Sequence, residues 1–398
     1  MFGNRKKFYS AGMALTFIFL TSLTFAQPLP EDPTKGARLF VNKGCVKCHA
    51  LKGDGGKGGP DLGKIDLGDS QLDLAAKLWN HTPSMIIGIE KARILKPKLT
   101  GEELNNIAAY LYFLKYFDEA GDVTRGRYLF NEKGCTSCHP LSGKGKRGES
   151  GLDEFPQNIS PVFLSREIWN HGPDMVASMV QLGMKWPEFK GNEMIDLLEY
   201  IKANAKGPRE IAYITPGNPR EGKRTFLSKG CAECHPASNG KSSPAGIDLM
   251  KKSKDFYRSL TQVASTMWNK GPVVLAKMSQ TKTGIPKFTP KEMADLTAYL
   301  YFLHFIDEPG NPATGKKLFS EMGCVKCHGE EGKRGILMHV DLSKYQKGST
   351  PIDIMAGIWN HSTEIEKAMR DRNLAWPRFK KGEMADLLEF VRTSKKKI

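Results

Sequence analysis

Gly44-Cys45-Val46-Lys47-Cys48-His49 is the stretch from which the organisation of this chain can be worked out. Its Cys-x-x-Cys-His pattern returns three more times, and the four pentads together use all eight cysteines of the 398 residues. They begin at Cys45, Cys135, Cys231 and Cys324, at intervals of 90, 96 and 93 residues. Such regular spacing predicts four copies of one module, which we number repeats 1 to 4.

Each pentad combines the residues that attach a c-type haem. Two cysteines form thioethers with the porphyrin vinyl groups, and the adjacent histidine ligates the iron. Cysteines three residues apart lie about one helical turn from each other, so both can reach one porphyrin. We therefore predict four covalently bound haem c groups with proximal histidines. The attaching residues are Cys45, Cys48 and His49; Cys135, Cys138 and His139; Cys231, Cys234 and His235; and Cys324, Cys327 and His328.

Two other uses of cysteine compete with haem attachment. Tetrahedral zinc needs four protein ligands, and no second ligand pair stands near any pentad in the sequence. Disulfides would suit an oxidising compartment. Neither alternative explains a histidine directly after every second cysteine.

Three helical segments are predicted in each module. A Gly-x-x-x-Phe segment such as Gly36 to Phe40 precedes the pentad and puts the glycine and the ring on one helix face. An amphipathic helix ends the module, and in repeat 1 it follows a capping box of Thr100 and Glu103. Between them, a helix reaches Trp-Asn-His or Trp-Asn-Lys. The Thr82-Pro83 pair after it predicts a corner at which a new helix starts.

Each repeat resembles a class I cytochrome c, a small all-helical haem domain. The resemblance covers nearly all of the chain after residue 26. It implies an all-α fold of four tandem haem domains, which we place at residues 27–119, 120–210, 211–309 and 310–398. It also implies that the first and last helices of a repeat cross at the glycine. The family's Gly-Pro pair, whose carbonyl holds the proximal imidazole, is present only in repeat 1, as Gly59 and Pro60.

The second axial ligand is less evident, because the resemblance implies a methionine before a proline. That position holds Lys96, Trp186, Ile285 and Trp376. Every repeat does have a methionine on one of two helical rungs after the corner, which favours thioether ligands. These candidates are Met85, Met179, Met278 and Met369. The alternative is a column of histidines, His81, His171 and His361, whose counterpart in repeat 3 is Lys270. With methionine ligands, we expect the corner tryptophans at the haem propionates or the haem rim.

The N-terminus predicts export. Arg5, Lys6 and Lys7 precede an apolar stretch, and small residues precede the expected cleavage after Ala26, so residues 1–26 are typical of a secretory signal peptide. If it is retained, the stretch from Phe8 to Ala26 would instead tether the protein to a membrane. We expect a periplasmic protein, attached to the inner membrane in the second case.

The formal net charge of +16 predicts a basic surface, which favours redox partners that are acidic at the contact. The lysines are dispersed and no recognition motif accompanies them, so nucleic acid is not expected as a partner.

Together, these features predict an exported tetrahaem cytochrome that carries single electrons between redox proteins, rather than an enzyme. The alternative is a multihaem oxidoreductase with an open, catalytic haem in repeat 3. It would need acid-base groups above that iron. Lys270 is the one titratable residue to which the comparison of repeats points.

Overall fold

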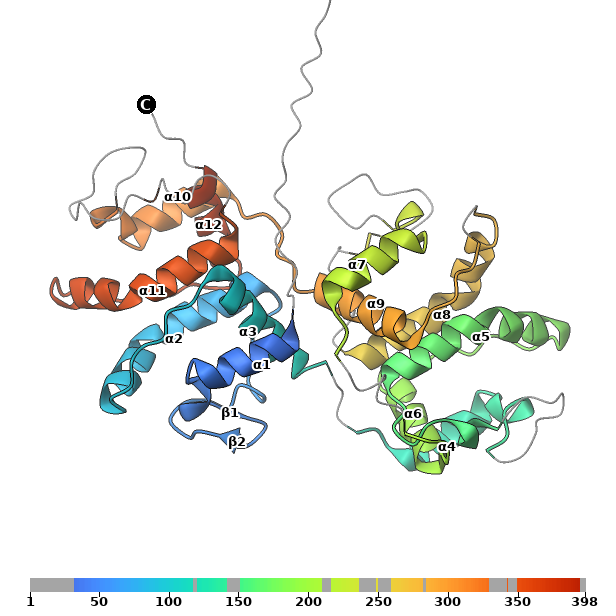
Figure 1. Cartoon of the computed structure of the whole chain (residues 1–398). Coiled ribbons are helices and arrows are strands. Elements are labelled where there is room, and N and C mark those ends of the chain that lie inside the picture. Colours follow the sequence, from blue (N-terminus) through green and yellow to red (C-terminus); the bar gives the residue numbers. More distant parts are fainter. Residues whose placement is uncertain are drawn as a thin grey trace, which may run out of the picture.

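The computed structural model describes residues 32–116, 120–141, 151–209, 216–235, 248–249, 259–281, 284–328, 342 and 349–393. The predicted signal segment lies outside these residues. Twelve α-helices make up most of the described chain, which confirms the all-α fold class (Figure 1). The strands found within these ranges are β1 (Ala50–Leu51) and β2 (Asp54–Gly55), a small antiparallel hairpin in repeat 1.

Each repeat has a short first helix, a long middle helix and a last helix. The first helices are α1 (Pro33–Asn42), α4 (Val123–Glu132), α7 (Pro219–Ser228) and α10 (Pro312–Glu321). The middle helices are α2 (Gln71–Lys91), α5 (Pro161–Gln181), α8 (Leu260–Met278) and α11 (Pro351–Arg370). The last helices are α3 (Gly101–Phe113), α6 (Glu193–Asn204), α9 (Pro290–Leu303) and α12 (Glu383–Thr393). Single 3₁₀ turns are η1 (Cys45–Lys47), η2 (Cys135–Ser137), η3 (Leu152–Glu154), η5 (Cys231–Glu233) and η6 (Cys324–Lys326).

The first and last helices of a repeat cross at the predicted glycine. A Cβ on Gly36 would lie 1.9 Å from the carbonyl oxygen of Asn106, so only glycine allows α1 to approach α3 this closely. Phe40, one turn later, meets Tyr110 edge-on with ring centroids 5.9 Å apart. Repeats 2 to 4 have the same contact at equivalent glycines, so the predicted crossing is confirmed in all four.

Side-chain caps determine where two of the last helices begin. At the start of α3, Glu103 N–H donates to the Thr100 hydroxyl while the Glu103 carboxylate accepts from Thr100 N–H. Thr289 and Glu292 form the same predicted capping box at the start of α9. The α6 helix starts at Glu193 without such a box, as its sequence indicates.

The predicted corner after each tryptophan is wrong, because the middle helices continue through it. Pro83 lies inside α2 and, having no N–H, leaves the carbonyl of Trp79 without its helical partner. Trp376 of repeat 4 donates its Nε1–H to that carbonyl at 3.1 Å. The chain therefore bends without ending its helix, and Figure 1 shows such bends clearly in α5 and α8. The corner was predicted wrongly because local sequence rules do not include a hydrogen-bond donor from another repeat.

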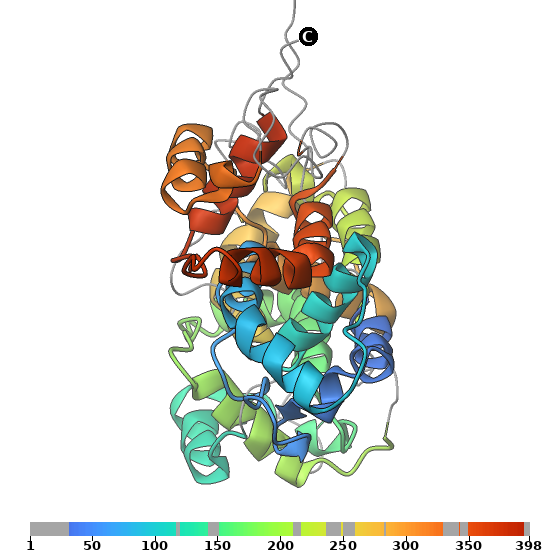
Figure 2. The ribbon, with the colours of Figure 1, turned by 90° about the vertical axis from the view of Figure 1, so that its left-hand side faces the viewer.

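The four repeats form two pairs, and one of these pairs joins the first repeat to the fourth. Repeat 1 packs on repeat 4, where α11 lies against α2 and α3, and repeat 2 packs on repeat 3, where α8 lies against α5 (Figures 1 and 2). We call these pair 1·4 and pair 2·3. In Figure 1 they make up the two halves of the molecule.

A Trp-Asn dipeptide from each repeat makes the polar contacts within a pair. In repeat 1, Trp79 Nε1 donates to the carbonyl of Pro377 at 2.8 Å. Asn80 donates to the Phe379 carbonyl and accepts from the Phe379 N–H, both at 2.8 Å. The dipeptides at 169–170, 268–269 and 359–360 repeat this pattern on their partners. Trp79 was expected at a haem propionate or at the haem rim. Its single N–H is used for docking, so it is not available to a propionate.

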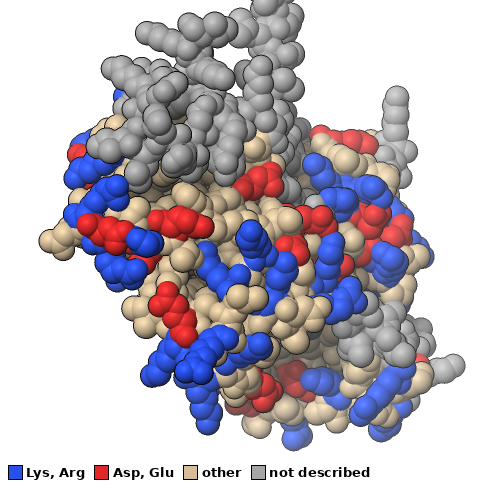
Figure 3. Space-filling view, turned by 60° about the vertical axis from the view of Figure 1, so that its left-hand side comes forward, with Lys and Arg blue, Asp and Glu red and all other residues tan. Residues whose placement is uncertain are grey.

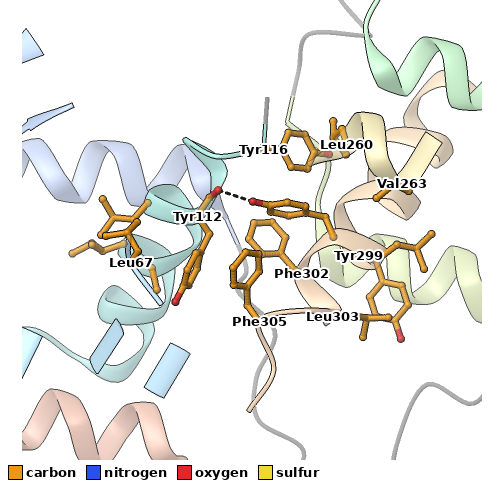
Figure 4. Packing of buried hydrophobic residues seen from close by; sticks show 14 of the residues in the cluster. Leu67, Tyr112, Tyr116, Leu260, Val263, Tyr299, Phe302, Leu303 and Phe305 are labelled. Carbon is orange, nitrogen blue, oxygen red and sulfur yellow. Dashed lines mark hydrogen bonds between the residues drawn. The ribbon is translucent and has the colours of Figure 1, made fainter. Parts of the chain in front are cut away.

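Aromatic side chains join the two pairs through repeats 1 and 3. Tyr112 stacks on Phe305 with centroids 4.0 Å apart, and Tyr301 donates its hydroxyl to the Tyr112 carbonyl at 3.0 Å. Figure 4 shows Tyr112 beside Phe305, and Tyr116 beside Leu260 of repeat 3. These residues are almost completely buried, so the contact is part of the core. No described helix has the length and apolarity required to cross a bilayer.

Candidate haem sites

A left-handed glycine leads into each pentad. Gly44 follows the end of α1 with φ of 79°, and the equivalent glycines at 134, 230 and 323 have φ of 78°, 79° and 79°. A residue with a Cβ is strained at this angle, so glycine suits the sharp turn between the helix and η1. In η1, His49 N–H donates to the Cys45 carbonyl at 3.0 Å, which closes the pentad into one compact turn. The role of these glycines was not predicted from the sequence, although one precedes every pentad.

The first thiol of each pentad is buried in its neutral form. All eight cysteines lie in the described part of the chain and none forms a disulfide. Burial raises the pKa of the Cys45 thiol to about 11. It raises the pKa of the first cysteine in each of the other three pentads to about the same value. A metal ligand would need the thiolate. No group of three or more His, Cys, Asp or Glu side chains suited to a metal occurs in the described ranges.

The proximal histidine of repeat 1 is held by a backbone carbonyl. His49 Nδ1 lies 2.9 Å from the Pro60 carbonyl oxygen, which confirms the contact expected from the Gly59-Pro60 pair. A Cβ at Gly59 would lie 2.5 Å from His49 Cε1, so the glycine is needed for this approach. The bond orients the ring and leaves Nε2 as the nitrogen available to a metal.

The pentad of repeat 1 opens on an apolar cavity of about 410 Å³. Cys45, Cys48 and His49 line one side, and α3 contributes Leu104, Ile107, Ala108 and Leu111. In repeat 2 the equivalent space is lined by Cys135, Cys138 and His139 on one side and by His171, Met175 and Met179 on the other. An apolar space beside two thiols and an imidazole is suited to a porphyrin.

A sequence model of the cytochrome c family matches four segments of the chain, residues 33–115, 123–205, 219–303 and 312–395. The chain belongs to the cytochrome c family. Each matched segment contains one pentad and lies inside one of the four domains predicted above, whose boundaries stay predictions. Searches among curated proteins and among solved structures found no match.

Cytochrome c domains bind haem c covalently, and the residues present fit that group. Repeat 1 provides two adjacent thiols, an oriented imidazole and an apolar cavity. Cys45 and Cys48 would attach the porphyrin and His49 would ligate its iron. When bound, the group supplies reversible one-electron chemistry. The protein contributes burial of the ring, orientation of the ligands and control of the potential.

On the distal side, three of these cytochrome c domains place a second imidazole opposite the first. The ring centroids of His49 and His81 are 6.1 Å apart. The corresponding separations are 6.0 Å for His139 and His171 and 6.5 Å for His328 and His361. Burial, and then the nearby His49, lower the pKa of His81, so its imidazole is neutral near pH 7. Neutral imidazole is the form that ligates metals.

The methionine candidates occupy less uniform positions. Met85 lines the cavity of repeat 1 beside His81, and Met179 lines that of repeat 2. Met369 is half-buried in repeat 4. In repeat 3, which has no histidine at this place, Met278 is buried and only 7% exposed, whereas Lys270 is exposed. Repeat 3 is thus the domain in which a methionine stands without a competing imidazole.

Proposed function

We propose that this chain is an exported tetrahaem cytochrome c that passes single electrons between redox proteins. The observation that carries the proposal is the pair of facing imidazoles in three of the four domains. Two protein ligands on one iron leave no coordination site for a substrate, so such a haem transfers electrons and does not bind reactants.

The separation of the rings supports histidine as the distal ligand in repeats 1, 2 and 4. Metal-nitrogen bonds of about 2 Å, and roughly 1 Å more to each ring centre, separate two opposed imidazoles by about 6 Å. The three measured separations lie between 6.0 and 6.5 Å. We therefore favour His81, His171 and His361 over Met85, Met179 and Met369.

Repeat 3 has a different distal side in this proposal. Met278 ligates its iron, since this side chain is buried and a histidine is absent from the column. A thioether ligand raises the reduction potential relative to an imidazole. The haem of repeat 3 is then the one that holds an electron most strongly.

A second candidate function also depends on repeat 3. If Met278 does not ligate the iron of repeat 3, that iron has an open coordination site, because Lys270 is exposed and does not fill it. The protein is then a multihaem oxidoreductase. Carbon monoxide added to the ferrous protein separates the two functions. Rapid binding at one haem in four supports the enzyme, and no binding supports the carrier.

Location and partners belong to the same proposal. The signal segment predicted at residues 1–26 supports a periplasmic location, with a membrane tether if the segment is kept. Figure 3 shows Lys and Arg side chains spread over one face of the molecule with Asp and Glu between them. The net charge of +16 and these exposed basic side chains support redox partners that are acidic at the contact. The rate of electron exchange with an acidic partner should then fall as salt is added.

Near-infrared magnetic circular dichroism of the ferric protein tests the ligands. We expect three bis-histidine haems and one histidine-methionine haem. Met278→Leu should remove the histidine-methionine signal, and Met85→Leu is the matched control that leaves the spectrum unchanged. Four histidine-methionine haems would reject the histidine assignment. A purified protein whose colour is extracted by acidified acetone would reject covalent haem, and with it the proposed function.

A further inference from the structure

The haem cavity of one repeat is closed by a side chain of another. Trp359 of repeat 4 lines the cavity of repeat 1 beside Pro97, and Trp268 of repeat 3 lines that of repeat 2 beside Pro187. In both cases the indole Nε1 donates to the carbonyl of that proline, at 2.8 and 2.6 Å. The tryptophan is therefore fixed as part of the cavity wall.

The same helix that supplies this tryptophan carries the distal histidine of its own repeat. On α11, Trp359 reaches the cavity of repeat 1, whereas His361 faces His328 in repeat 4. Residues two apart on a helix point in nearly opposite directions, so one tripeptide contacts two haem sites. Trp79 and His81 on α2 form the reciprocal arrangement, since Trp79 stacks on repeat 4 and His81 faces its own proximal histidine.

Contacts between the pairs are of another kind. Among the described helices, extensive packing between repeats joins repeat 1 to 4 and repeat 2 to 3. Repeats 1 and 3 meet through Tyr112, Tyr301 and Phe305, and none of these residues lines the cavity of repeat 1 or of repeat 2. A side chain that lines the haem cavity of another repeat is thus observed once in each pair, as Trp359 in pair 1·4 and Trp268 in pair 2·3.

We propose that the tryptophan of each Trp-Asn dipeptide forms part of the haem pocket of the repeat on which it docks. The haem sites are thereby connected as two pairs, 1 with 4 and 2 with 3, and not in the order of the sequence. Within a pair, one electron leaves a ferrous iron and reduces the ferric iron of the partner, and no bond forms or breaks. This inference rests on the proposed function, because it requires haem at all four pentads.

The iron positions in a crystal of the holoprotein test the pairing without any substitution. The two shortest iron-iron distances should join repeat 1 to repeat 4 and repeat 2 to repeat 3. A shortest distance between repeats 1 and 2, or between repeats 3 and 4, would overturn the inference. A chain that carries no haem would instead refute the proposed function, so the two failures can be told apart.

Redox titration tests whether paired haems influence each other. His81→Ala opens the haem of repeat 1 and marks it with a high-spin spectrum. Because a neighbouring haem changes its charge on oxidation, this marked haem should depart from a simple one-electron curve. Cys324→Ala with Cys327→Ala removes the haem of repeat 4 and should restore the simple curve.

The matched control removes the haem that is next in the sequence. Cys135→Ala with Cys138→Ala deletes the haem of repeat 2 and should leave the titration of the marked haem unchanged. The reverse result, a change on losing the haem of repeat 2 and none on losing that of repeat 4, would overturn the pairing. If a deletion variant does not fold, the iron positions in the crystal decide.

Discussion

Pair 1·4 and pair 2·3 share one docking scheme, and two of the positions at which they differ adjoin the docking residues. In both, the indole and the amide of every Trp-Asn dipeptide bond to the partner's backbone. The residue before the docking proline differs, being Lys96 and Trp376 in pair 1·4 but Trp186 and Ile285 in pair 2·3. The residue after the dipeptide differs as well, because Lys270 replaces a histidine in repeat 3.

Docking does not depend on the residue that follows the Trp-Asn dipeptide, which we proposed as the distal ligand in repeats 1, 2 and 4. Trp268 and Asn269 keep their bonds to the partner even though Lys270 follows them. Repeat 3 thus docks like the other repeats without a histidine after its dipeptide. Under the ligands proposed above, the assembly combines haems of different potential at one docking geometry.

The largest effect is expected where the ligand sets differ. Lys270→His should make pair 2·3 resemble pair 1·4, because an imidazole would then face His235. The number of bis-histidine haems should rise from three to four, and the potential of that haem should fall by on the order of 0.1 V, within the roughly 0.8 V that axial ligands span. Magnetic circular dichroism and potentiometry measure both changes. Lys270→Ala is the control without an imidazole, and identical spectra for the two variants would contradict the prediction.

A large loss of stability is expected from removing a docking amide. Asn80→Ala leaves the N–H and the carbonyl of Phe379 without their partner. Each orphaned group costs about 1–3 kcal/mol, so a loss of roughly 3 kcal/mol is expected in urea unfolding of the holoprotein. Asn170→Ala should destabilise pair 2·3 to the same extent. In Asn131→Ala the lost amide bond lies within one helix, so an equal loss there would show that docking is not the cause.

A smaller loss is expected at the proline bend. Trp376→Phe keeps an aromatic ring near Trp79, with which the native indole stacks at 4.2 Å, but removes the donor to the Trp79 carbonyl. Since Pro83 cannot serve that carbonyl, we expect a cost of about 1–2 kcal/mol in the same unfolding measurement. Trp186→Phe should cost a similar amount in pair 2·3. No change in either variant would mean that water replaces the indole N–H.

The smallest effect is a gain. Ile285 stands where repeats 2 and 4 have tryptophan, and it has no donor for the Trp169 carbonyl, which Pro173 also cannot serve. Ile285→Trp should supply that donor and a second indole stack, and so stabilise pair 2·3 by about 1 kcal/mol. Thermal unfolding of the holoprotein measures it. Ile285→Leu is the control, and a gain of equal size there would assign the effect to packing alone.

The sequence was sufficient for features whose partners lie within one repeat. Gly36 and Phe40, the Thr100 capping box and the Pro60 carbonyl on His49 all follow from short-range spacing or from the family resemblance. Their geometry depends on backbone directions that a few residues determine.

The pairing of repeats could not be predicted in this way. Trp79 and Asn80 contact residues 298 and 299 positions away, and no spacing in a single sequence shows which repeat will face which. The helix through Pro83 was missed for the same reason, because its exposed carbonyl finds a donor on repeat 4. The Trp-Asn pattern was visible four times, but the role considered for its tryptophan, if methionines were the ligands, was contact with a haem and not docking on another repeat.

Repeat 1 docks on repeat 4, and repeats 2 and 3, which lie between them in the sequence, dock on each other. During N-to-C synthesis, repeats 2 and 3 can associate as soon as repeat 3 has emerged, whereas the contact surface of repeat 1 stays uncovered until the C-terminal end is delivered. Loss of the final repeat would therefore leave the N-terminal repeat with a bare apolar face. Repeat 1 thus depends for the cover of this face on repeat 4, which is the last of the four repeats to be synthesised.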